Sequence, residues 1–156
     1  MKLRRDPYKI FCGSKTPAGL YARQKWLGQA QSPGWQADFK DRVDKLLDGQ
    51  SSDGSWGQSP LSTIARLFGL HLTVRAADHR IDAGLDWLMG QIRLTSKGIG
   101  IDDEFEIKAP DLHGLPFAVS RPEMFLTAAA LFLSSIFNRL DDPIFRMPGF
   151  TSGNGQ

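Results

Sequence analysis

Cysteine, net charge and histidine clusters are all scarce in this chain of 156 residues. The single cysteine, Cys12, excludes an intrachain disulfide framework and a zinc site built from several thiolates. The 19 basic and 17 acidic residues leave a net charge of +2, which is too small and too evenly mixed to indicate a nucleic-acid partner. The three histidines, His71, His79 and His113, lack the spacing of metal ligands. We therefore expect no metal, no cofactor and no nucleic acid.

Long hydrophobic runs are also missing. The basic start at residues 1–7 is not followed by the apolar core of a signal peptide. The longest run without a charge, residues 124–138, is shorter than the about 20 residues that a spanning helix needs, and it contains polar side chains. We expect a buried core helix there, no transmembrane segment, and a cytoplasmic protein that is at most peripheral to a membrane.

The composition that remains is that of one folded domain. Hydrophobic residues make up 41% of the chain and charged residues 23%, which is ordinary for a globular protein and unlike a disordered one. A chain of this length is expected to form one compact domain with a sizeable core.

Caps, prolines and apolar spacing predict an all-α protein. Thr16-Pro17 and Ser59-Pro60 each combine a helix N-cap with proline at the first helical position, whereas Ser32-Pro33-Gly34 is expected to stop a helix. The predicted helices cover residues 16–30, 37–48, 61–74, 81–91 and 122–140. Residues 1–15 are expected to form an N-terminal extension, 93–119 an irregular insertion within the domain of residues 16–140, and 141–156 an irregular tail.

Charge is distributed unequally among these helices. Residues 61–74 and 122–140 are almost uncharged, whereas 37–48 and 81–91 have one apolar and one charged face. The alternation predicts two layers, with inner helices surrounded by protein and outer helices wetted on one side. This is the arrangement of helical hairpins laid side by side.

Internal repeats support the hairpins independently. A Thr-x-Ala-x-Leu-aromatic pattern begins at Thr16, recurs at Thr63 and recurs again at Thr127, each time within a predicted inner helix. The outer helices share a second pattern, in which Leu47-x-Gly49-Gln50 corresponds to Leu88-x-Gly90-Gln91. The two patterns agree in phase, so we infer a repeat.

The junction after the second helix carries the most distinctive motif, Gln50, Gly54 and Trp56 within one short segment. It resembles the QW repeat, Gln-x(2–5)-Gly-x-Trp, of squalene and oxidosqualene cyclases and of related α/α-toroid proteins. Trp87 and Gln91 form a partial further copy, and residues 31–35 form a degenerate one. The resemblance covers residues 16–92, and residues 120–140 fit as one more inner helix.

The residue types of this motif indicate a structural role. Gln50 lies at a helix end, where its amide can satisfy an unpaired carbonyl or bond the start of the next helix. Gly54 allows a turn, and the Trp56 indole can seal the hairpin junction. None of the three is a nucleophile, an acid or a metal ligand.

The resemblance implies a partial α/α toroid of about two and a half hairpins, in which inner and outer helices alternate. An inner helix without an outer partner leaves apolar surface uncovered. The resemblance therefore implies either a piece of a longer ancestor or a domain completed by self-association or by a partner protein.

Catalytic motifs of the related enzymes are not found. The Asp-x-Asp-Asp acid of the class II cyclases has no counterpart, and the zinc ligands of the prenyltransferases are not matched, since no aspartate lies two residues before Cys12. The nearest acidic string contains Asp102, Asp103 and Glu106. A similar string binds magnesium diphosphate in class I terpenoid enzymes. These three are weak cofactor-binding candidates, and a solvated loop is the other interpretation. We assign no catalytic residue.

Aromatic residues supply the candidate ligand-lining set. In the related cyclases, aromatic faces in the cavity stabilise cations. The corresponding residues on predicted inner helices are Tyr21, Phe68, Phe125 and Phe132. Packing between helices is the alternative role of these rings.

Two functions stay open at this stage. The first is a squalene cyclase/prenyltransferase-like repeat domain that binds an apolar, isoprenoid-like ligand or a partner protein on its inner-helix face, without catalysis of its own. The second is a fragment of a class II terpenoid cyclase whose acid motif lies outside this chain. Whether the chain is an enzyme is left undecided.

Overall fold

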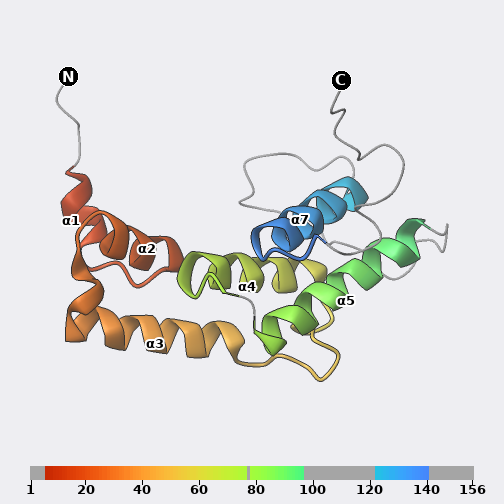
Figure 1. Ribbon diagram of the computed structural model, residues 1–156, viewed down its shortest axis with the longest axis horizontal. Helices are drawn as coiled ribbons and strands as arrows, with labels where there is room; N and C mark the ends of the chain where they lie inside the picture. The colour runs from red at the N-terminus through yellow and green to blue at the C-terminus, as the bar shows by residue number, and fades with distance from the viewer. Residues whose placement is uncertain (1–5, 77, 97–121, 141–156) are drawn as a thin grey trace, which may run out of the picture.

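The computed structural model describes residues 6–76, 78–96 and 122–140, and these residues confirm the all-α class (Figure 1). No strand occurs among them. The described helices are α1 (Pro7–Phe11), α2 (Pro17–Lys25), the short 3-10 helix η1 (Gln29–Gln31), α3 (Pro33–Leu47), α4 (Pro60–Thr73), α5 (His79–Ser96) and α7 (Pro122–Ile136).

A polar cap followed by proline begins four of the helices. Thr16 and Ser59 cap α2 and α4 as predicted, through bonds from the backbone N–H groups three residues later. Ser32 does the same for α3, so the prediction that Ser32-Pro33 ends a helix is wrong. The side chain of Ser32 accepts a hydrogen bond from the Trp35 N–H (3.3 Å), and α3 therefore begins four residues earlier than expected.

Several predicted boundaries move. Helix α2 ends at Lys25 instead of residue 30, because Gly28 adopts a left-handed conformation (φ 62°) and turns the chain into η1. Helix α1 lies inside the segment predicted as an extension, and α5 continues to Ser96, into the segment predicted as irregular. Helix α7 ends at Ile136 instead of residue 140, since Asn138 is left-handed (φ 59°). Most of the predicted insertion and the whole tail lie outside the described residues.

Helix α4 is the centre of the packing and contacts α2, α3, α5 and α7. Helix α3 also packs against α2, and α5 also packs against α7. Figure 1 shows α3 and α5 along one side, with α2, α4 and α7 above them. The amphipathic helices α3 and α5 thus lie on one side of the apolar helices α4 and α7.

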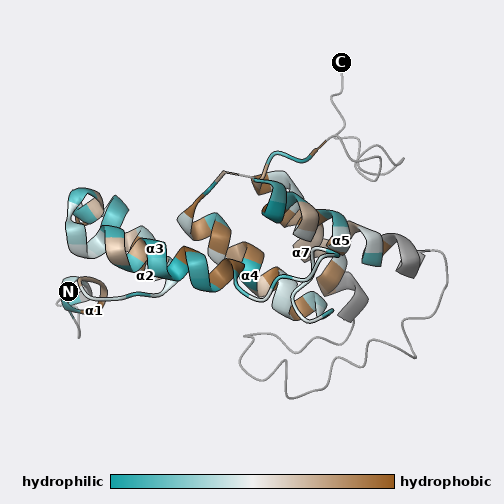
Figure 2. Cartoon of the chain, turned by 90° about the horizontal axis from the view of Figure 1, so that it is seen from below, coloured by the Kyte–Doolittle hydropathy of each residue, from teal (hydrophilic) through white to brown (hydrophobic). Residues whose placement is uncertain are grey.

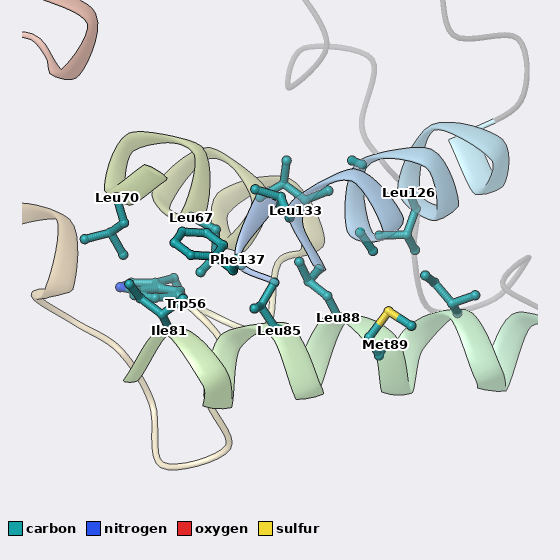
Figure 3. Close-up of a cluster of buried hydrophobic side chains, with 14 of the residues drawn as sticks. Trp56, Leu67, Leu70, Ile81, Leu85, Leu88, Met89, Leu126, Leu133 and Phe137 are labelled. Atoms are coloured by element: carbon teal, nitrogen blue, oxygen red, sulfur yellow. The ribbon is translucent and has the colours of Figure 1, made fainter. Parts of the chain in front are cut away.

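The main core lies between α4, α5 and α7 (Figure 3). Figure 3 shows Trp56 at one end of this cluster, near Leu67, Leu70 and Ile81, with Leu126 and Met89 towards the other end. Leucines and isoleucines fill its centre, and the fully buried ones are Leu67, Leu70, Ile81, Leu85, Leu88 and Leu133. Small residues allow the helices to approach closely, as at Gly69, against which the Leu46 side chain of α3 packs.

The first two copies of the sequence repeat agree in burial at the alanine, leucine and aromatic positions but not at the threonine, and the third copy departs further. Leu20 and Leu67 occupy the same repeat position and are both fully buried. The corresponding Leu131 of α7 is partly exposed, and Ala130, one residue earlier, is buried in its place. Since one residue is a rotation of about 100° in a helix, α7 presents a different side. This rotation brings Phe132 towards solvent, at 50% exposure.

Candidate functional site

The amide of Gln50 ties the turn after α3 to the start of α5. Its Nε2 donates to the carbonyl oxygens of Gly54 (2.9 Å) and Arg80 (2.8 Å). Its Oε1 accepts from the Nε of Arg80 at 3.2 Å, and the same guanidinium donates to the Leu47 carbonyl. Both polar atoms of the Gln50 amide are therefore engaged by the backbone or by Arg80.

Trp56, whose side chain is only 3% exposed, joins three helices at this junction. Its Nε1 donates to the Asp48 carbonyl at the end of α3 (3.1 Å), and its backbone N–H donates to the Thr63 hydroxyl of α4 (3.1 Å). The ring lies against Gly84 of α5, where an added Cβ would stand 3.1 Å from it. The segment thus connects α3, α4 and α5, and its polar groups face partners inside the fold.

An acid–hydroxyl pair occurs in the same turn. The Asp53 carboxylate accepts from the backbone N–H (2.9 Å) and the hydroxyl (2.7 Å) of Ser55, and these bonds lower the pKa of Asp53. The Ser55 oxygen in turn accepts from the Gln58 N–H at 3.2 Å. Ser55 is fully buried, so this pair shapes the turn and offers no accessible nucleophile.

The partial motif copy on α5 has a less central place. Trp87 is partly buried and packs against the main core from α5. Gln91, one turn later, is also partly buried. Neither side chain lies in the turn that Gln50 and Trp56 close.

The predicted lining residues separate into two groups. Phe68 of α4 and Phe132 of α7 stack, with ring centroids 5.6 Å apart and an interplanar angle of 20°. Phe125 is partly exposed and packs against the same core. Tyr21 belongs to a different group: its ring is edge-on to Trp26 (6.2 Å), and the Arg75 guanidinium lies over it at 4.3 Å.

The stacked pair lies on an uncharged surface, which we call the α4–α7 face. Residues three or four apart share one side of a helix, and the Phe68–Phe132 contact joins one such side of each helix. All members of the face are exposed or partly exposed, and none carries a charge: Leu61, Ala65, Phe68 and Leu72 of α4, and Phe125, Ala128, Phe132 and Ser135 of α7. Figure 2 shows hydrophobic residues concentrated on α4 and hydrophilic ones on α3.

The nearest charged side chain of α4 points elsewhere. Arg66 donates to the Lys45 carbonyl at the end of α3, on the other side of the helix. The sequence identified the aromatic residues of the α4–α7 face but not its boundaries. Those boundaries depend on how α7 is rotated about its axis. The repeat pattern predicts that Leu131 faces the core, whereas the structure buries Ala130, one residue earlier.

His71 borders this region. Its Nδ1 is buried and has no hydrogen-bond partner among the described residues, and its ring packs edge-on to Phe137 (5.9 Å). Burial, and secondarily the charge of Arg75, lowers the pKa of His71 below its usual value. The neutral imidazole is therefore favoured in the folded state.

A pH dependence of stability follows. Because the pKa of His71 is lower in the folded than in the unfolded chain, the free energy of unfolding is expected to fall as pH drops below about 6.5, where the unfolded chain takes up the proton first. Urea melts of wild type and His71→Leu between about pH 7.5 and 5.5 measure the difference in slope. His79→Gln, at an exposed position, is the control. Equal slopes for wild type and His71→Leu would contradict the assignment.

The sequence analysis did not predict the two salt bridges that join the end of α7 to α5. The guanidinium of Arg139, just after α7, contacts Asp82 and Asp86 of α5, each at 2.6 Å. Both bonds raise the pKa of Arg139, with that of Asp82 the larger. The i, i+4 spacing of the two aspartates was visible in the sequence, whereas the approach of Arg139 depends on the tertiary packing.

The acidic string Asp102, Asp103 and Glu106 lies outside the described residues, as does His113. Within residues 6–76, 78–96 and 122–140, no group of three His, Cys, Asp or Glu side chains could hold a metal ion. In the same ranges, no helix has the length and apolarity needed to cross a membrane.

Comparisons with known protein families, with curated proteins and with solved structures each return no match for this chain.

Proposed function

We propose that this chain is a squalene cyclase/prenyltransferase-like helical repeat domain whose α4–α7 face binds an apolar, isoprenoid-like chain, without catalysis of its own. One observation carries the proposal: the stacked Phe68–Phe132 pair, with Phe132 half exposed, lies on a surface without charge.

The packing of the helices supports the repeat architecture. Helices α2 and α3 form one hairpin and α4 and α5 a second, with α7 against both helices of the second hairpin. The segment from Gln50 to Trp56 closes the junction between the hairpins through its bonds to Asp48, Thr63 and Arg80. A junction sealed by a glutamine amide and an indole is the structural role that the QW resemblance implies.

The chemistry of the face favours a hydrocarbon occupant. Covering apolar surface gains about 25 cal/mol per Å², and the half-exposed Phe132 ring offers such surface. The face supplies no cation to pair with a diphosphate or a carboxylate. A branched chain with double bonds, such as a polyprenyl alcohol, presents C–H groups and π bonds to the two stacked rings and needs no ion pair.

The same composition argues against independent catalysis on this face. Acid–base or nucleophilic chemistry needs a carboxylate, an imidazole or an activated hydroxyl within hydrogen-bond reach of the reacting atoms. The only polar side chain of the α4–α7 face is the Ser135 hydroxyl, and the imidazole that borders the face, His71, has its Nδ1 buried.

Native mass spectrometry with polyprenyl alcohols of increasing length tests the proposal. We expect wild type to retain one bound chain and Phe132→Ala to bind it about tenfold more weakly, because half an aromatic side chain of contact is lost. Trp26→Ala is the matched control, since Trp26 is also an exposed aromatic but lies outside the face. Equal urea midpoints of the three proteins show that the fold is kept.

Other outcomes contradict the proposal. Binding that is absent in wild type, or equal in wild type and Phe132→Ala, removes the α4–α7 face as the binding site. A dimer in light scattering that Phe132→Ala dissociates, without any bound chain, identifies the face as a contact between copies instead.

A further inference from the structure

A second exposed apolar group lies at the other end of the described structure, and we call it the N-terminal surface. It consists of Tyr8, Lys9 and Ile10 of α1, together with Lys25 and Trp26 at the end of α2. Figure 1 shows α1 and α7 towards opposite ends of the long axis. The N-terminal surface is therefore separate from the α4–α7 face.

Trp26 is the most exposed large hydrophobic side chain of the described residues, at 68%. Its ring is nevertheless held in place, with Phe11 edge-on at 6.3 Å and Tyr21 edge-on at 6.2 Å. Arg75, two residues after the end of α4, in turn lies over the Tyr21 ring. An indole fixed in this way loses little conformational freedom when a partner covers it.

Helix α1 extends the apolar area. Tyr8 is 57% exposed and Ile10 is 52% exposed. Both belong to the same helix as Phe11, whose ring contacts Trp26. Three of the six large hydrophobic side chains that are exposed among the described residues therefore belong to α1 and the end of α2.

Unpaired positive charge accompanies these side chains. Lys9 and Lys25 are exposed and have no ion-pair partner among the described residues, whereas Lys15 pairs with Asp38. The nearby carboxylate, Asp6, caps α1 by accepting from the Tyr8 N–H at 3.0 Å.

The charge asymmetry extends to the whole sequence. Residues 1–26 carry seven basic side chains and one acidic side chain, a net charge of +6, and residues 27–156 carry twelve basic and sixteen acidic side chains, a net charge of −4. The chain as a whole is close to neutral, yet its N-terminal sixth is strongly basic.

We propose that the N-terminal surface docks onto an anionic lipid bilayer. Trp and Tyr side chains favour the membrane–water interface, where the ring is in an apolar layer and the polar edge reaches water. Lysines place their apolar stems in the same layer while their ammonium groups meet lipid phosphates. Trp26, Tyr8 and Ile10 enter the interface, and Lys9 and Lys25 contact the headgroups.

A nucleic acid is the other polyanion that aromatic and basic side chains bind, and one feature favours the bilayer. Ile10 gives aliphatic surface that cannot stack on a base but fits an acyl layer.

Titration with vesicles tests the proposal, using the intrinsic fluorescence of the chain. At low ionic strength, phosphatidylcholine vesicles with about 30% phosphatidylserine are expected to shift the tryptophan emission to the blue and to sediment the protein, whereas pure phosphatidylcholine is not. Trp26→Ala, which also removes the responding fluorophore, is expected to abolish sedimentation with the anionic vesicles. The Lys9→Gln/Lys25→Gln double variant is expected to bind about 25-fold more weakly, at about fivefold per cation near an anionic surface.

Phe132→Ala is the control, since its exposed ring lies outside the N-terminal surface, and its vesicle binding should equal that of wild type. Circular dichroism confirms that each variant is folded. The proposal is overturned if wild type binds neutral and anionic vesicles equally or binds neither, or if Trp26→Ala binds as wild type does. Binding to a single-stranded oligonucleotide with no vesicle binding would also overturn it.

Discussion

Replacing Trp56 with alanine is expected to lower the free energy of unfolding by about 3–5 kcal/mol, the range for truncating a buried aromatic side chain. The indole is 3% exposed, lies against Gly84 and donates to the Asp48 carbonyl, so the variant leaves a cavity and an unpaired acceptor at one point. The total free energy of unfolding of a domain of this size is about 5–15 kcal/mol. The loss is therefore a large share of the stability, and urea denaturation measures it directly.

Gln50→Ala supplies the second side of a double-mutant cycle. Gln50→Ala is expected to lower the free energy of unfolding less, by about 1–3 kcal/mol, because the carbonyls of Gly54 and Arg80 lose their donor. Gln50 and Trp56 pair through their backbones in an isolated bridge, so the two effects should fall short of additivity. Trp26→Ala, at an exposed indole, is the control. An unchanged urea midpoint for Trp56→Ala would contradict the structural role of the motif.

The second large effect is expected at Gly54. Its φ of +92° disfavours any residue with a Cβ, and an alanine Cβ there would stand 2.2 Å from the Ala83 carbonyl oxygen of α5. Backbone strain of about 1–3 kcal/mol and a similar cost of forcing α5 away add up, so we expect Gly54→Ala to lower the free energy of unfolding by about 2–6 kcal/mol.

Gly57→Ala separates the two contributions. Gly57 also has a positive φ (+65°), but nothing lies within 4 Å of the position of its Cβ. Gly57→Ala should therefore lower the free energy of unfolding by only about 1–2 kcal/mol, the strain of a left-handed alanine. If thermal and urea unfolding show the two variants to be equally stable, the close approach of α5 to the turn is not what requires glycine at Gly54.

Local signals predicted where most of the helices lie. Thr16-Pro17 and Ser59-Pro60 identified the starts of α2 and α4 because a cap and a proline satisfy the first turn without help from the rest of the fold. The same signal at Ser32-Pro33 was misinterpreted, since proline and glycine also end helices. The decisive difference is the bond from the Trp35 N–H to Ser32, which the sequence does not show.

The candidate surface was harder to predict. The sequence repeat placed Tyr21, Phe68 and Phe132 at equivalent positions, yet Tyr21 packs with Trp26 and Arg75 while the two phenylalanines stack on each other. The difference arises from tertiary packing: α7 is rotated by one residue relative to the repeat, so that Ala130 and Leu133 face the core. Residue type alone does not encode that rotation.

Photocrosslinking with a diazirine-bearing polyprenyl alcohol, followed by peptide mapping, tests most directly whether the α4–α7 face holds an apolar chain. The account predicts adducts in α4 and α7, on residues of the set around Phe68 and Phe132, that excess unlabelled polyprenol removes. Adducts confined to α3, α5 or the N-terminal surface, or adducts that unlabelled polyprenol does not displace, would contradict it.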